Sequence, residues 1–164
     1  MRASALAFVS TVALLPQFCR VAAEDWDILN DDFSWAEFVD GCVRMSDPAQ
    51  ETEAVVRAAA IEALTRFAQS SKTATVEEAF GAEKWPNVAE ALIKAAGDFD
   101  RDVKMKCLEF WRVVLEKSRI QSVDGAQIRK ETLRRGLKVL VMVAKYDEHA
   151  PCRDRAKEVF DLFR

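Results

Sequence analysis

Residues 97–108 read GDFDRDVKMKCL, and this stretch decides the fold that the sequence predicts. Its first half is rich in glycine and aspartate, which favour turns and helix N-termini, and its second half places apolar residues at helical spacing. An acidic turn of the same kind precedes a helical pattern at residues 46–48 and again at residues 147–151. The sequence therefore predicts a repeated unit of helix, acidic turn and helix.

Four of the expected helices open in the same way, with an apolar residue, a basic residue and then small or apolar residues. The shared basic residue is Arg2, Arg57, Lys104 or Arg153, so that successive copies lie 55, 47 and 49 residues apart. Repeats of the HEAT and armadillo kind recur at about 40–47 residues, and stacking of such hairpins buries the apolar stripe that one hairpin leaves open. The sequence therefore predicts an all-α fold, an α-solenoid of about three and a half stacked hairpins in a single domain over residues 1–164.

Apolar periodicity gives the expected helices and core, and no stretch shows sustained strand alternation. Helices are expected near 1–15, 33–45, 51–70, 86–96, 100–119, 125–146 and 150–163, with a short one near 75–81. Pro48 and Pro151 are expected to end the helices before them, and the aspartates of the turns to cap the helices after them. Side chains that share one phase in the aligned copies are expected to be buried: Leu64, Phe67, Leu108, Trp111 and Phe160.

Composition is that of one globular domain, because the 164 residues are 50% apolar and 31% charged. The net charge is −3, which argues against a nucleic-acid binder driven by bulk charge. Residues 1–82 carry 6 basic and 13 acidic side chains, whereas residues 83–164 carry 18 basic and 14 acidic ones. Such an uneven distribution favours contacts with charged protein partners.

The N-terminus has two interpretations. An apolar run over residues 3–15 and the small residues Val21 to Ala23 resemble a secretory signal, so the chain could be a small secreted helical protein cleaved after residue 23. Cleavage would leave three cysteines, an odd number, and the chain has no Asn-x-Ser/Thr site. The repeat pattern instead predicts that residues 1–15 pack on the helix at 51–70, and we rank this interpretation first.

Motifs for catalysis, cofactors or metals are missing from the sequence. The four cysteines stand apart without a Cys-x-x-Cys pair, the five glycines are scattered, and the single histidine, His149, falls in an expected turn. Cys107 aligns with Ala5, Ala60 and Ala156, which predicts a small core residue rather than a ligand or nucleophile. We therefore expect a protein that is not an enzyme and that has no cofactor or metal.

Two clusters are candidates for contact with a partner. Lys130, Arg134 and Lys138 recur at every fourth position, with Arg135 beside them, so they form either a solvated helix face or a docking surface for an acidic partner. Aromatic residues do not alternate with them, which argues against single-stranded nucleic acid. The second cluster is Trp26 within the acidic stretch 24–32, which either anchors a loop or engages a partner.

Three stretches carry a resemblance to a known family. They are Arg2-Ala3-Ser4-Ala5, then Asp98-Phe99-Asp100-Arg101-Asp102-Val103 followed by Leu108-Glu109, and the spacing from there through the turn at 144–151 to a last helix ending near Phe163. With these, nearly the whole chain resembles the C-terminal HEAT-repeat region of the breast-cancer-protein-associated activators of the ATM kinase, and another HEAT or armadillo protein is the alternative. The resemblance implies a non-enzymatic scaffold of the DNA damage response, in nucleus and cytoplasm, that associates with the ATM kinase and with the RNA endonuclease module of the Integrator complex. It carries over no site residue.

Overall fold

A computed structural model describes residues 35–71, 73, 75–119 and 126–162, and within them the chain forms seven helices and no strand. The helices are α2 (Trp35–Ser46), α3 (Ala54–Ser70), α4 (Val76–Phe80), α5 (Trp85–Ala95), α6 (Arg101–Arg119), α7 (Ala126–Tyr146) and α8 (Ala150–Asp161). Each begins and ends within three residues of the range that the sequence predicts. The all-α class is confirmed, while the helix expected at 1–15 lies outside the described residues.

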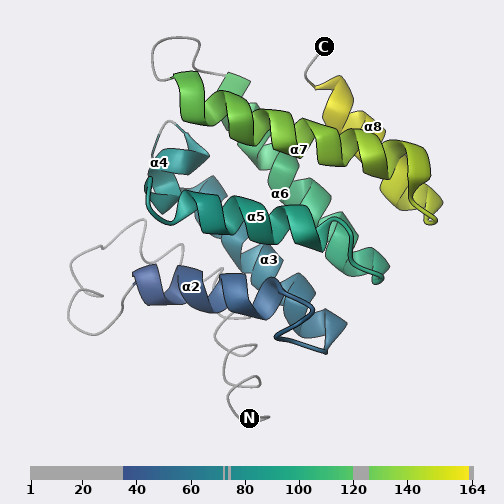
Figure 1. The fold of residues 1–164 in the computed structure, drawn as a ribbon, viewed down its shortest axis with the longest axis horizontal. Coiled ribbons are helices and arrows are strands. Elements are labelled where there is room, and N and C mark those ends of the chain that lie inside the picture. Colours follow the sequence, from purple (N-terminus) through teal and green to yellow (C-terminus); the bar gives the residue numbers. More distant parts are fainter. Residues whose placement is uncertain (1–34, 72, 74, 120–125, 163–164) are drawn as a thin grey trace.

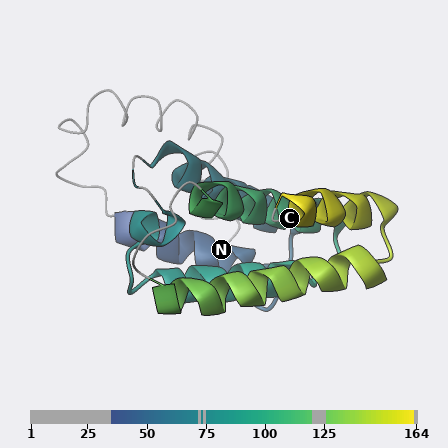
Figure 2. The same cartoon turned by 90° about the horizontal axis from the view of Figure 1, so that it is seen from above.

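The long helices alternate between two layers (Figures 1 and 2). Helices α2, α5 and α7 form one layer, in which α5 contacts both α2 and α7. Helices α3, α6 and α8 form the other layer, in which α6 contacts both α3 and α8. The chain crosses from the first layer to the second in each of the pairs α2–α3, α5–α6 and α7–α8, so three helical hairpins stand side by side in chain order.

The core lies between the two layers and contains most of the side chains expected there. Ala60, Cys107 and Ala156, which occupy aligned positions on the three helices of one layer, are all fully buried, which confirms the prediction for Cys107. Leu64 on α3 and Leu108 and Trp111 on α6 are also fully buried, as predicted.

Two of the expected core residues are only half-buried. Phe67 lies in the last turn of α3 and packs at the core edge on the ring of Phe80, with ring centroids 5.1 Å apart. Phe160 lies in the last turn of α8, and α8 is the last described helix, so no described helix covers its outer side. The prediction of full burial was wrong at both positions because each side chain sits at an edge of the helix array.

The expected short helix is present as α4, and it adds an aromatic cluster to the core. Phe80 ends α4 and stacks on Trp85, the first residue of α5, with ring centroids 6.1 Å apart. Trp85 in turn stacks on Phe110 of α6 at 6.4 Å. Pro86 lies in the first turn of α5, where its missing N–H costs nothing because that donor has no partner inside the helix.

The three hairpin turns share one local structure. Asp47, Asp98 and Asp147 each use Oδ1 to accept the backbone N–H of the residue two positions later, at 2.8 Å in every case. This hydrogen bond closes the turn, which is a common role of aspartate at such positions. Asp47, Asp98 and Asp147 therefore organise the turn itself rather than the first turn of the next helix.

The predicted helix caps and stops are partly correct. Asp100 caps α6, because its Oδ1 accepts the N–H groups of Asp102 and Val103. The corresponding N-cap residues of α3 and α8 are Glu53 and His149, whose side chains make no capping hydrogen bond. Pro151 does not end the preceding helix as predicted but lies in the first turn of α8, a position that proline tolerates.

Candidate functional site

Buried ion pairs hold each hairpin to the next. Arg57 of α3 reaches the turn of the following hairpin, where its Nε lies 2.8 Å from Oδ2 of Asp98, and both side chains are almost fully buried. Lys104 of α6 makes the equivalent contact, with its Nζ 2.8 Å from Oδ2 of Asp147 in the next turn. Lys104 comes 47 residues after Arg57, and Asp147 comes 49 residues after Asp98, so one interaction occurs twice.

The charges of these pairs set the protonation of the turn carboxyls. Burial by itself would raise the pKa of Asp98, but the hydrogen bonds from Arg57 and from the backbone N–H of Asp100 outweigh it, so the pKa lies below its ordinary value. For Asp147 burial again acts upward, while Lys104 and the backbone N–H of His149 lower the pKa of the carboxyl. Both turn carboxylates are therefore held in the charged form.

Two equivalent ion pairs also join neighbouring helices on the surface of the α3–α6–α8 layer. The carboxylate of Glu62 on α3 accepts a hydrogen bond from Nζ of Lys106 on α6 at 2.7 Å. In the same way, the carboxylate of Glu109 on α6 accepts one from Nη2 of Arg155 on α8 at 2.7 Å. These side chains are partly exposed, so each contact contributes little to stability on its own. Their repetition still shows that α6 sits on α3 as α8 sits on α6.

The candidate residues Lys130, Arg134, Arg135 and Lys138 all fall on α7. We call the exposed side chains Arg134, Arg135 and Lys138 the basic surface of α7. The backbone of Lys130 is helical, but its side chain lies outside the described part of the chain, as does Trp26. The structure therefore brings three of the predicted partner-binding residues together on one helix of the α2–α5–α7 layer.

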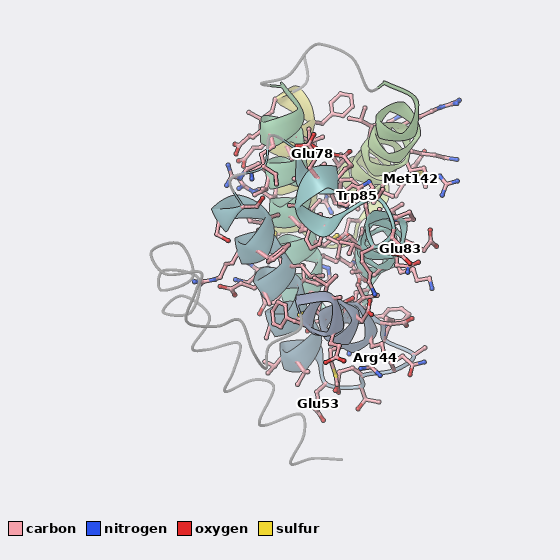
Figure 3. All side chains as sticks on the ribbon, turned by 90° about the vertical axis from the view of Figure 1, so that its left-hand side faces the viewer. Arg44, Glu53, Glu78, Glu83, Trp85 and Met142 are labelled. Carbon is pink, nitrogen blue, oxygen red and sulfur yellow. The ribbon has the colours of Figure 1, made fainter. Side chains whose placement is uncertain are left out.

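A groove runs between α5 and α7 beside this surface, with a volume of about 420 Å³. We call it the α5–α7 groove. Its apolar part comes from Ile93, Ala96, Val139, Met142 and Val143, and its polar lining from Glu90, Gly97, Arg135 and Lys138. Met142 is half-exposed, and Figure 3 shows it between α7 and α5. Sequence patterns could not indicate this groove, because its walls come from two helices about 40 residues apart.

A second groove, the α2–α5 groove, lies on the other side of α5 and has the opposite character. It is lined by Glu37, Asp40, Val43, Arg44, Asp47, Gln50, Asn87, Glu90, Ala91 and Lys94. Four of these residues are acidic and two are basic, and Asp40 pairs with Lys84 at 2.5 Å. The same helix layer thus presents a mainly acidic groove beside a mainly apolar groove that has two basic residues and shares Glu90 with it.

The turn before α8 also brings together Asp147, His149 and Cys152, whose possible metal-binding atoms all lie within 4.8 Å of one another. The spacing of these three residues in the sequence is not one that indicates a metal site. Lys104 already places its ammonium 2.8 Å from the Asp147 carboxylate, where it would repel a divalent cation. Burial also raises the pKa of the Cys152 thiol, which disfavours the thiolate that a metal site or a nucleophile needs.

Burial likewise governs the other two described cysteines. It raises the pKa of Cys42 to about 12 and also raises that of Cys107, whose Sγ donates to the carbonyl oxygen of Leu92 at 2.9 Å. Both side chains are fully enclosed in the core. Neither thiol is therefore available for surface chemistry in the folded protein.

None of the helices in the described ranges combines the length and the apolar composition that would let it cross a membrane. Comparison of the chain with models of protein families, with curated proteins and with solved structures finds no match.

Proposed function

We propose that this chain is a scaffold of HEAT- or armadillo-like helical repeats that binds a protein partner through the α2–α5–α7 layer. The repeat interpretation is supported by the two equivalent buried ion pairs, Arg57 with Asp98 and Lys104 with Asp147. Because each pair joins a helix of one hairpin to the turn of the next, neighbouring hairpins are fixed relative to one another. Stacked hairpins of this kind offer extended surfaces that suit binding.

The observation that carries the binding function is the basic surface of α7 beside the α5–α7 groove. Arg134, Arg135 and Lys138 are exposed, and the groove next to them exposes apolar atoms, Met142 among them. Apolar surface supplies affinity on association, and a basic border steers an acidic partner to it and fixes its orientation. The chemistry of this surface is that of a docking site rather than of a catalytic one.

The resemblance in the sequence supplies the first partners to examine. We propose that the scaffold acts in the DNA damage response, in nucleus and cytoplasm, and associates with the ATM kinase or with the endonuclease subunits of Integrator. The chain itself is proposed to carry out no reaction.

The test reverses charge on the basic surface of α7 and measures association. The variant Arg134→Glu/Lys138→Glu changes two exposed side chains, so the fold should persist. A control, Lys157→Glu, reverses an exposed lysine on α8 in the other layer. The rate of binding to the ATM kinase or to the Integrator endonuclease subunits is measured by surface plasmon resonance over a series of salt concentrations.

We expect the double variant to associate about tenfold or more slowly at low salt and to show a weaker salt dependence, because rim charges act chiefly on the association rate. The control should behave as the unmodified protein does. Binding of the double variant at the unmodified rate at every salt concentration would show that the basic surface of α7 is only a solvated helix face.

A further inference from the structure

We propose that the α5–α7 groove receives an acidic amphipathic α-helix of the partner protein, with its apolar side chains on Met142 and its carboxylates at Arg135 and Lys138. This inference rests on the proposed function and specifies the chemistry of the partner. It follows from the shape, the apolar lining and the charge of the groove, together with the charge of the neighbouring groove.

The shape of the groove fits a helix. Helices α5 and α7 run side by side in one layer (Figure 1), and side chains of both line the groove between them. Small residues, Ala96 and Gly97, line it at the end of α5 and leave room for side chains of a partner. A helix seats its side chains in such a groove as it does in a helix pair, and the layer has no sheet edge among the described residues that would favour an extended peptide.

The apolar positions of α7 set the length of the partner. Val139 and Met142 line the groove, and Tyr146, just beyond its lining, continues the same side of α7 at spacings of three and four residues. Met142 is 52% exposed and Tyr146 is 73% exposed, although both are large apolar side chains. From Arg135 to Tyr146 the helix rises about 16 Å, which equals three turns of a partner helix.

The charged residues around the α5–α7 groove favour an acidic helix, and those of the α2–α5 groove disfavour it there. Lys138 is exposed and makes no ion pair with another described residue, so its ammonium is available to a carboxylate of the partner. The α2–α5 groove on the other side of α5 has four acidic and two basic lining residues, whereas the α5–α7 groove has two basic residues and one acidic residue, Glu90, which lies between the grooves and lines both, so an acidic helix is favoured in the α5–α7 groove. The charges therefore direct an acidic helix to the α5–α7 groove rather than to the α2–α5 groove.

The experiment uses a phage-displayed library of 16-residue peptides, and the immobilised full-length protein is the target. Enriched peptides are synthesised, and their dissociation constants are measured by fluorescence anisotropy for four variants of the protein. Met142→Glu and Lys138→Glu change the groove. The controls are Val55→Glu, an apolar residue on α3 that is 73% exposed against 52% for Met142, and Lys157→Glu on α8. Far-UV circular dichroism verifies that each variant is folded.

We expect enriched peptides with more acidic than basic residues, with apolar residues at spacings of three and four, and with helical circular dichroism when bound. Met142→Glu and Lys138→Glu should each weaken binding about tenfold or more, and the controls should change it less than about twofold. Enrichment of basic or extended peptides, no enrichment, or equal binding by the groove variants would overturn the inference.

Failure of this inference and failure of the proposed function give different results. If a partner loses binding to Arg134→Glu/Lys138→Glu but binds Met142→Glu normally, the scaffold function holds and the partner contacts the basic surface without a helix in the groove. If neither variant alters partner binding, the docking site itself is misplaced.

Discussion

Replacing Asp98 by alanine removes the acceptor of a buried charge and tests how the hairpins are held together. In the folded protein the Asp98 carboxylate accepts hydrogen bonds from Nε of Arg57 at 2.8 Å and from Nη2 of Arg57 at 3.0 Å. It also accepts one from the backbone N–H of Asp100 at 2.8 Å. After the substitution the Arg57 guanidinium stays buried, and of its donors only Nη1 keeps partners, the carbonyl oxygens of Glu51 and Thr52. Loss of one partner of a buried ion pair costs about 3–5 kcal/mol of unfolding free energy.

Asp47 supplies a matched control within the same chain. It closes its turn with the same 2.8 Å hydrogen bond to a backbone N–H, but the nearest described cation, Nζ of Lys94, is 3.9 Å away and both side chains are partly exposed. Asp47→Ala should therefore lose only the turn hydrogen bond and a weak surface contact, about 0.5–1.5 kcal/mol. The difference between the two variants isolates the contribution of the contact between hairpins.

Urea unfolding at pH 7, followed by circular dichroism, measures both variants. Asp98→Ala should lower the unfolding free energy by at least about 1.5 kcal/mol more than Asp47→Ala does. Equal losses for the two variants would refute the reasoning, because the contact from Arg57 would then contribute nothing beyond the turn.

The pH dependence gives a second readout of the same pair. The pKa of Asp98 is lower in the folded protein than in the unfolded chain, so near that pH the unfolded chain binds more protons. Asp98 therefore makes its full contribution to the unfolding free energy above its pKa in the unfolded chain, about 3.9. This contribution is lost as the pH falls through the lower pKa of the folded protein. Between about pH 5 and pH 2, the unfolding free energy of Asp98→Ala should fall less than that of the unmodified protein.

Three further outcomes follow from the core. Leu108→Ala should lower the unfolding free energy by about 2–5 kcal/mol, because the side chain is fully buried, and an unchanged urea midpoint would contradict its placement. Gly136→Ala should destabilise the protein by about 1–3 kcal/mol, although alanine favours helix. The reason is that the new Cβ would lie 2.7 Å from Cε3 and 2.9 Å from Cη2 of Trp111. A gain in melting temperature would show that α6 and α7 do not approach so closely. Cys42 should react with a thiol reagent at pH 8 only after unfolding, since burial raises its pKa to about 12, and rapid labelling of the folded protein would argue against its burial.

The sequence was sufficient for the positions of the helices and for much of the core. Apolar spacing located α5 and α6, and the alignment of Cys107 with Ala60 and Ala156 correctly placed three small side chains in the core. These features depend on local periodicity and on the repeat, both of which are visible in one chain. Phe67 shows the limit, because a position in the right phase is buried only where another element covers it.

The contacts between elements could be predicted only in part. The alignment already matched Arg57 with Lys104, but it did not reveal that each reaches the aspartate of the following turn, 41 or 43 residues further along the chain. The α5–α7 groove was out of reach for a different reason. Its form depends on how far two helices stand apart, which in turn depends on side-chain packing such as that of Gly136 on Trp111.

Hydrogen–deuterium exchange of the protein with and without an enriched acidic peptide tests the central claim, that this helical array binds a partner through the α5–α7 groove. Peptide binding is predicted to slow exchange in residues 90–97, which form the second half of α5 and the two residues after it, and in residues 134–146 of α7, and to leave α3 and α8 unchanged. Protection confined to α3, α6 and α8, or no protection on α5 and α7, would contradict the claim.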